Sequence, residues 1–361
     1  MKFLARVILK GIFLFLLVNL FFAVGSPDLG KISAYNHLFP SRPRLPFGEN
    51  PREAYNFSLF NLDAMFESHE ISAGKPAREF RVVLIGDSSV WGTLLQPDET
   101  LAGQLNAMGL SAPDGRNLRF YNLGYPTLSL TKDLMVLDRA LAYQPDLVIW
   151  LATLESFPLD KQLNVPLVEN NLSEARSVIT KYGLALETPP DQQTGLWARS
   201  LVGQRKNVAD ILRLQLYGAM WAATGIDQIY PEDYPPAQVD LEADPTFHGE
   251  AELRREALLM EVFERAQAQM GAVPLLVVNE PILVSTGENS DIRYNYYYPR
   301  EAYDQYRRWL GEQAAMDGFA YLDAWDIVPQ DSFTNSAIHI NREGTALLAA
   351  EIRDEVLRLV E

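Results

Sequence analysis

The sequence predicts an α/β fold, with a parallel sheet of about five strands between helices on both faces, in three layers, plus a helical insertion. Short and almost wholly apolar runs of strand length recur along the chain, as expected of strands buried on both faces of a parallel sheet. Several of these runs are followed by a segment with apolar residues at helical spacing. Alternation of this kind is typical of a parallel sheet that is covered by helices.

The predicted strands and helices follow one another from residue 80 onward. The first strand is expected over Val82 to Ile85, because this β-branched and apolar run stops at the small residue Gly86. The other expected strands are Leu118 to Asn122, Pro145 to Ala152, Val273 to Val278 and Phe319 to Leu322, and the expected helices are Asp98 to Met108, Leu130 to Tyr143 and a last one after Asn341.

The alternation breaks between about residues 160 and 250, where helical patterns from Leu172 to Tyr182 and from Trp197 to Ala223 are separated by proline-containing stretches. We interpret this region as an insertion after the third strand, which is either a cap or lid near the site or a structural appendage. Residues 26–79 are rich in Pro, Gly and Asn and are expected to form a stalk or an extended arm lying on the domain. Residues 80–361 then form the main domain.

The first 25 residues have the pattern of an export signal. Lys2, Arg6 and Lys10 precede an uncharged run of 14 residues, Gly11 to Val24, whereas about 20 residues are needed to span a bilayer. The run approaches that length if Lys10 snorkels, but Ala23-Val24-Gly25 would also serve as a cleavage site. Segment 1–25 is therefore either a signal-anchor in the membrane or a cleaved signal peptide. In both cases we expect the rest of the chain outside the cytoplasm, anchored or secreted.

Composition excludes several classes of function. The chain has 361 residues and a net charge of −16, and so acidic a surface repels nucleic acid. It contains no cysteine, which excludes disulfides, thiolate catalysis and cysteine-based zinc sites. The sequence shows neither a cluster of ligands with metal-binding spacing nor a glycine-rich phosphate loop, so we expect no metal and no cofactor.

The triplet Gly86-Asp87-Ser88 follows the first strand and places Ser88 at the carboxyl edge of the sheet, where open α/β sheets bind ligands. The same triplet is also ordinary turn and N-cap chemistry. A nucleophilic serine needs a base, and His339 is the one histidine between a predicted strand and a helix, at the same edge. Its place at a helix N-terminus favours the neutral ring that a base requires. His248 is the weaker competitor, and His37 and His69 are expected to be surface or packing residues.

On these residues the sequence resembles the SGNH (GDSL-like) hydrolase superfamily, which implies a flavodoxin-like fold. The resemblance covers about residues 80–155 and 270–361. It implies that Ser88 is the nucleophile and that His339 is the general base. It also implies that the backbone N–H groups of Ser88 and Gly124 hold the oxyanion. The matching segments are Gly86-Asp87-Ser88, Tyr121-Asn122-Leu123-Gly124, Pro145-Asp146 and His339 with the helix through Gly344.

Two positions depart from the family pattern. Glu155 stands where the family usually has an asparagine that donates to the oxyanion, and an ionised carboxylate has no hydrogen to donate. Asn279, at the end of the fourth strand, is the alternative amide donor. Asn335 stands near the usual aspartate that orients the histidine and could do so through its carbonyl oxygen, as the amide does in Cys-His-Asn proteases. The other options are Asp323, Asp326 or Asp331, or a Ser–His dyad without a third member.

The resemblance and the location together imply a serine ester hydrolase for O-acyl groups on envelope or extracellular glycans. Asp87 and Trp91 are the candidate substrate contacts, and Trp91, Tyr294 and Tyr296 to Tyr298 could stack on sugar rings, although such aromatic residues more often serve packing. Two alternatives stay open. One is an O-acyltransferase that works with a membrane partner, and the other is a catalytically weakened glycan-binding or scaffold module.

Overall fold

The structure is a computed structural model that describes residues 2–27, 29–31, 34, 38, 41–47, 60–188, 195–225 and 253–361. Within these ranges the chain forms a five-stranded parallel sheet with the order β2-β1-β3-β4-β7, which confirms the predicted fold class. Each strand lies within a few residues of its expected place. The strands are β1 (Glu79–Ile85), β2 (Asn117–Asn122), β3 (Leu147–Ala152), β4 (Leu275–Asn279) and β7 (Ala320–Asp323).

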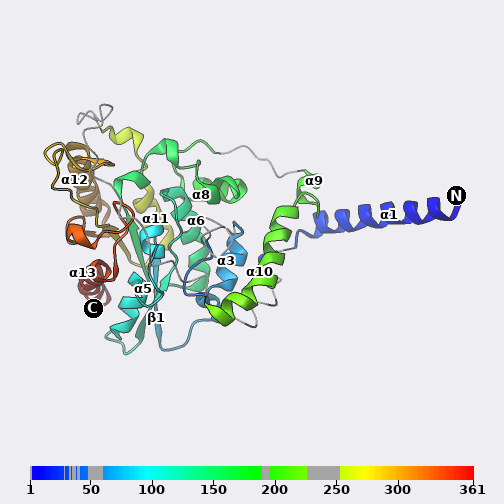
Figure 1. The fold of residues 1–361 in the computed structure, drawn as a ribbon, viewed down its shortest axis with the longest axis horizontal. Helices are drawn as coiled ribbons and strands as arrows, with labels where there is room; N and C mark the ends of the chain where they lie inside the picture. The colour runs from blue at the N-terminus through cyan, green and yellow to red at the C-terminus, as the bar shows by residue number, and fades with distance from the viewer. Residues whose placement is uncertain are drawn as a thin grey trace.

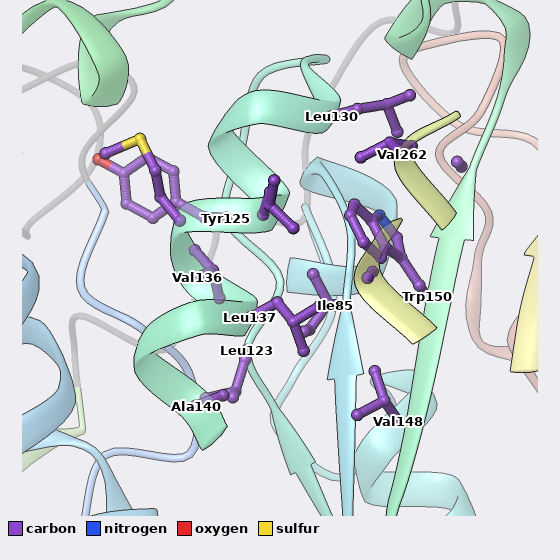
Figure 2. Close-up of a cluster of buried hydrophobic side chains, with 14 of the residues drawn as sticks. Ile85, Leu123, Tyr125, Leu130, Val136, Leu137, Ala140, Val148, Trp150 and Val262 are labelled. Atoms are coloured by element: carbon purple, nitrogen blue, oxygen red, sulfur yellow. The ribbon is translucent and has the colours of Figure 1, made fainter. Parts of the chain in front are cut away.

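The two faces of the sheet bury two separate hydrophobic cores. Successive residues of β1 point to opposite faces, so Val82 and Leu84 belong to one core and Val83 and Ile85 to the other. Figure 2 shows the second core, in which Ile85 lies among side chains of neighbouring elements. The first core is covered by α5 (Leu101–Ala107) and α13 (Arg342–Val360), and the second by α6 (Leu130–Ala140), α8 (Leu172–Tyr182), α11 (Val262–Met270) and α12 (Arg300–Asp317).

A short helix, α4 (Ser88–Trp91), follows β1 directly at the carboxyl edge of the sheet. Asp87 caps it, because its Oδ1 accepts a hydrogen bond of 2.7 Å from the N–H of Ser89. The helix ends at Gly92, whose φ of 90° lies in the left-handed region that favours glycine. Residues 87 and 92 therefore fix both ends of the turn that carries Ser88.

The described part of residues 26–79 lies against the domain. The Arg44 guanidinium is buried, donates to the carbonyl oxygens of Gly92 (2.7 Å) and Leu95 (3.2 Å), and stacks on the ring of Trp91. Further along, α3 (Leu62–Ser68) packs into the core. This part is thus a packed arm. The core residues of α3 are Leu62, Ala64, Met65 and Phe66.

The predicted insertion contains the expected α8 and also the short α7 (Pro166–Glu169). The single helical run expected from Trp197 to Ala223 is divided into α9 (Leu196–Arg199) and α10 (Arg205–Thr224). The helix α8 contacts α6 and α11 and contributes to the second core. In Figure 1, α9 and α10 lie where α1 (Lys2–Gly25) leaves the body of the molecule. A small hairpin of β5 (Arg293–Asn295) and β6 (Tyr298–Pro299), which the sequence did not predict, precedes α12.

The helix α1 has 24 residues, and an 18-residue stretch of it has a mean hydropathy of 2.5, so by length and composition it could cross a membrane. A signal sequence would have the same properties. Both expectations for segment 1–25 therefore remain compatible with this helix.

Candidate active site

The structure brings Ser88 and His339 together across the carboxyl edge of the sheet. The distance between Ser88 Oγ and His339 Nε2 is 2.7 Å, although the two residues are 251 positions apart in the chain. Ser88 opens α4 after β1, and His339 lies in the loop just before α13. Asn341 caps α13 by accepting a hydrogen bond of 2.9 Å from the N–H of Gly344, which fixes the end of that loop.

Asn335 is the partner of the other ring nitrogen of His339. Its Oδ1 lies 2.7 Å from His339 Nδ1. An amide oxygen can only accept, so Nδ1 carries the hydrogen and the lone pair of Nε2 faces the hydroxyl of Ser88. Among the aspartates that were alternatives, Asp323 instead pairs with Arg307 at 2.7 Å. Ser88, His339 and Asn335 thus form a continuous hydroxyl–imidazole–amide chain.

His339 is held in its neutral form. It is only 8% exposed, and burial lowers its pKa to about 4, while the charge of Asp87 acts in the opposite direction. The sequence led us to expect a neutral ring because of the nearby helix N-terminus, but burial is the main cause. A neutral imidazole facing a serine hydroxyl has the protonation state of a general base.

The two expected oxyanion donors differ in the structure. The backbone N–H of Ser88 donates to no acceptor among the described residues. The N–H of Gly124 instead donates to Asn122 Oδ1 at 3.1 Å. Gly124 is also needed for packing, because a Cβ there would lie 2.3 Å from the backbone nitrogen of Trp91. Of the two, only the N–H of Ser88 has no competing acceptor.

Thr127, which the sequence analysis did not single out, has two unusual properties. Its φ is 84°, which is rare for a β-branched residue and indicates backbone strain. Its hydroxyl is buried and has no hydrogen-bond partner in the described part of the chain. Thr127 lies in the loop between β2 and α6, which is fixed beside β1 by a bond of 3.0 Å from the N–H of Tyr125 to the carbonyl of Gly86. Tyr125, two residues before Thr127, is therefore fixed beside Gly86, two residues before Ser88.

The side chains of Glu155 and Asn279 are engaged with other groups. Glu155 lies just after β3 and its carboxylate forms an ion pair with Lys161. Asn279 is fully buried, and its amide nitrogen donates to Asp323 Oδ1 at 2.8 Å. The structure thus does not present the Asn279 amide as a donor at Ser88. The carboxylate of Glu155 is neutralised by a lysine.

The two candidate substrate contacts, Asp87 and Trp91, are buried parts of the scaffold. Asp87 is the cap of α4. Trp91 has no exposed surface, and its Nε1 donates to the carbonyl of Leu45 at 2.8 Å. Tyr294 and Tyr298 are buried as well, whereas Tyr297 is exposed. Trp91 is therefore a packing residue here and presents no ring face to a sugar.

A buried cluster of charged side chains lies directly behind the turn of Ser88, and no sequence pattern indicated it. Lys132 donates to the carbonyl oxygens of Gly86 (2.9 Å) and Tyr125 (2.7 Å) and pairs with Asp133 at 2.5 Å. These bonds join the first turn to the loop of Thr127. On the other side, Ser89 donates to Glu280, and burial together with the nearby Asp87 raises the pKa of Glu280 well above its usual range.

Of the other histidines named above, His69 is described and is a buried packing residue, whereas His37 and His248 lie outside the described residues. His69 therefore fits its expected role. Of the two histidines considered as the base, His339 contacts Ser88 in the structure, and nothing is described for His248.

No family model matches the chain, and no curated protein matches it. Solved structures do. One is a lipase/acylhydrolase from Enterococcus faecalis, with 15% identity and a TM-score of 0.37, over 77% of this chain and 96% of that chain. Another is a carbohydrate acetylesterase from Sinorhizobium meliloti, with 15% identity and a TM-score of 0.34, over 77% of this chain and 99% of that chain. A lipolytic protein of the G-D-S-L family from Veillonella parvula is also among them, with 10% identity and a TM-score of 0.34, over 76% of this chain and 96% of that chain. These solved structures are 10–15% identical to this chain, and the likeness is one of fold alone.

Proposed function

We propose that the chain is a serine ester hydrolase that acts outside the cytoplasm. The observation that carries the proposal is the 2.7 Å contact between Ser88 Oγ and His339 Nε2, with the imidazole held by Asn335 on its other side. This arrangement has the nucleophile, base and orienting group that acyl transfer needs.

The reaction follows from these contacts. Ser88 Oγ attacks the ester carbonyl carbon while His339 Nε2 takes the hydroxyl proton. The carbon–oxygen bond to the alcohol then breaks, and the imidazolium returns that proton to the leaving oxygen. A water molecule attacks the acyl-serine in the same way, so that the products are an alcohol and a carboxylic acid and the enzyme is restored.

We assign the oxyanion to two donors, the N–H of Ser88 and the hydroxyl of Thr127. Both lack an acceptor among the described residues, and both lie at the same edge of the sheet. The strained backbone of Thr127 supports a functional role, since such strain persists only where the surroundings impose it. The Thr127 hydroxyl would then replace the asparagine amide that Glu155 does not supply.

The location and the substrate class rest on the N-terminus. The basic residues Lys2, Arg6 and Lys10 at the start of α1 favour a cytoplasmic start and an extracytoplasmic domain. An ester hydrolase at this place meets the O-acyl groups of envelope and extracellular glycans, and we propose these as its substrates. The domain is then membrane-anchored, or secreted if α1 is removed.

The test is hydrolysis of p-nitrophenyl acetate by the full chain, with Ser88→Ala compared with Ser89→Ala. Loss of the Ser88 nucleophile should lower kcat about 10³-fold or more. Ser89 lies in the same turn, but its hydroxyl bonds to Glu280, so Ser89→Ala should retain the rate within about threefold. Equal rates for Ser88→Ala and the unchanged chain would contradict the proposal. A fluorophosphonate probe should label the unchanged chain and not Ser88→Ala.

A further inference from the structure

The helix α10 exposes a stripe of apolar side chains along one face. Leu212, Leu216 and Met220 are 56%, 75% and 50% exposed, and their spacing of four residues places them above one another on the helix. The opposite face is already used, because its apolar residues are buried against the protein. Exposed leucine at this density is unusual in water and indicates a partner. The buried residues of α10 are Ile211, Leu214, Gly218 and Trp221.

The charge of this region is opposite to that of the whole chain. Residues 195–225 contain four basic residues and one acidic residue, Asp210, which gives a net charge of +3, whereas the chain carries −16. By helical spacing Lys206 and Arg213 lie along one edge of the apolar stripe, and Arg213 pairs with Asp210 at 3.2 Å. An apolar face bordered by lysine and arginine is typical of a helix that lies in a membrane interface. The four basic residues are Arg199, Arg205, Lys206 and Arg213.

The same region contacts the helix that could span a membrane. The short helix α9 packs against α1, and the N–H of Val202, just after α9, donates to Asn19 Oδ1 at 3.1 Å. Asn19 and Ala23 are the buried residues of α1, so this contact lies near its C-terminal end. Leu196 and Trp197 of α9 stay exposed beside it. Figure 1 shows α9 at the point where α1 leaves the body, with α10 next to it.

These positions match the depth of a bilayer. About 20 helical residues span the hydrocarbon, so the contact at Asn19 lies close to the level where α1 would leave the membrane. Tryptophan is enriched at this level, where its ring meets the lipid headgroups. Trp197 belongs to α9, which contacts α1, and the chain continues from α9 into α10, whose apolar stripe is exposed.

We infer that α9 and α10 form a second membrane contact, with Leu196, Trp197, Leu212, Leu216 and Met220 inserted among the lipids of a bilayer that contains anionic phospholipid. This surface holds the domain at a fixed orientation on the membrane, in addition to the tether of α1. The inference goes beyond the proposed hydrolysis and does not depend on it, but it requires that α1 is retained in the membrane. The helix α1 contacts α9, and Asn19 accepts a hydrogen bond from Val202, which suits a helix that stays attached.

The experiment uses the absence of cysteine in the chain, which allows a single labelled cysteine at any position. Leu216→Cys is placed in the stripe, and Leu347→Cys on α13 is the matched control, since Leu347 is 45% exposed. Leu14→Cys reports on α1 itself. Each full-length variant carries an environment-sensitive fluorophore and is reconstituted in vesicles of phosphatidylcholine and phosphatidylglycerol. Quenching by spin-labelled lipid is compared with quenching by aqueous iodide.

We expect spin-labelled lipid to quench the label at 216 at least about threefold more than the label at 347, and iodide to show the reverse order. Equal lipid quenching at 216 and 347 would overturn the inference. Protection of 216 from both quenchers would also overturn it, because protein would then cover the stripe. Absence of lipid quenching at 14 would mean that α1 is not in the bilayer and would overturn it as well. Ester hydrolysis measured in the same samples is expected to be unaffected by the label at 216, so a failure of the membrane contact stays distinguishable from a failure of the proposed chemistry.

Discussion

Two buried histidines of this chain have the same pKa but different partners. Burial lowers the pKa of both His69 and His339 to about 4. His69 donates through Nε2 to the backbone carbonyls of Pro43 (3.2 Å) and Asn122 (3.0 Å) and accepts from the N–H of Ile71 (3.1 Å). The Nε2 of His339 faces a hydroxyl instead. A carbonyl has no proton to give and a hydroxyl has one, so the partner, and neither burial nor pKa, separates a packing histidine from a candidate base.

The largest expected effect comes from removing each ring in turn. His339→Ala should lower kcat for p-nitrophenyl acetate about 10³-fold or more, because the base is lost. Its free energy of unfolding should fall by less than that of His69→Ala, because the ring of His339 bonds two side chains and no backbone group. His69→Ala leaves a buried cavity and three unpaired backbone groups, so it should lower the free energy of unfolding by about 2–4 kcal/mol. The kcat of its folded fraction should stay within a few-fold.

These two quantities are measured by urea unfolding and by steady-state kinetics on the same preparations. Loss of rate in folded His69→Ala equal to that in His339→Ala would break the comparison, since the two rings would then not have separate roles.

The sequence predicted the sheet and the meeting of Ser88 with His339 for one physical reason. Buried parallel strands have an apolar composition that can be read locally, and their carboxyl ends share one edge whatever the connections between them. A polar residue after β1 and another before α13 must then lie at the same edge. Asn335 was one of several options, because three loop residues separate it from His339 and loop conformation has no periodic signal.

The remaining parts of the site depend on contacts between distant segments. Trp91 is hidden by Arg44 from an arm with no regular period, so its burial could not be foreseen. Lys132 looks like an ordinary helix-surface residue in sequence, yet it lies fully buried between two backbone carbonyls and Asp133. The left-handed backbone of Thr127 had no glycine to indicate it. A Pro-Thr pair in a loop was the one available hint.

Replacing Thr127 by valine tests the oxyanion donors and is expected to have the next largest effect. Valine keeps the β-branched shape but has no hydroxyl, so kcat should fall about 10²-fold with KM nearly unchanged, as for loss of one oxyanion donor. The stability should stay the same or rise slightly, because a buried unpaired hydroxyl is removed. Thr127→Ser retains the hydroxyl and should keep most of the rate. If valine and serine behave alike in kcat, the hydroxyl has no part in the reaction.

The pH dependence of kcat/KM should reflect the lowered pKa of His339. The base acts when neutral, and a ring with a pKa of about 4 stays neutral at pH values where an ordinary histidine, with a pKa of 6.5, is protonated. We therefore expect kcat/KM for p-nitrophenyl acetate to be nearly constant from neutral pH down to about pH 5 and to fall with a midpoint near pH 4. Circular dichroism at each pH should confirm that the chain stays folded over this range. A midpoint near 6.5 would mean that the free enzyme leaves this ring open to solvent.

The smallest expected change in rate comes from Asn335→Asp, which tests the contact between residue 335 and the ring of His339. A carboxylate 2.7 Å from Nδ1 favours imidazolium, so the pKa of His339 should rise and the acid limb of kcat/KM should move to higher pH. At pH 8 the variant should be a few-fold faster than the unchanged chain, because the charge that forms on the ring is stabilised. At pH 5 it should be slower, since more of its base is protonated, and the two profiles should cross.

Asn335→Ala removes the orienting oxygen and should lower kcat about tenfold or more without raising the pKa of the ring. Profiles of the aspartate variant that run parallel to the unchanged chain would show that residue 335 does not act on His339. The Ser88–His339 pair would then work as a dyad, with the ring held by burial alone.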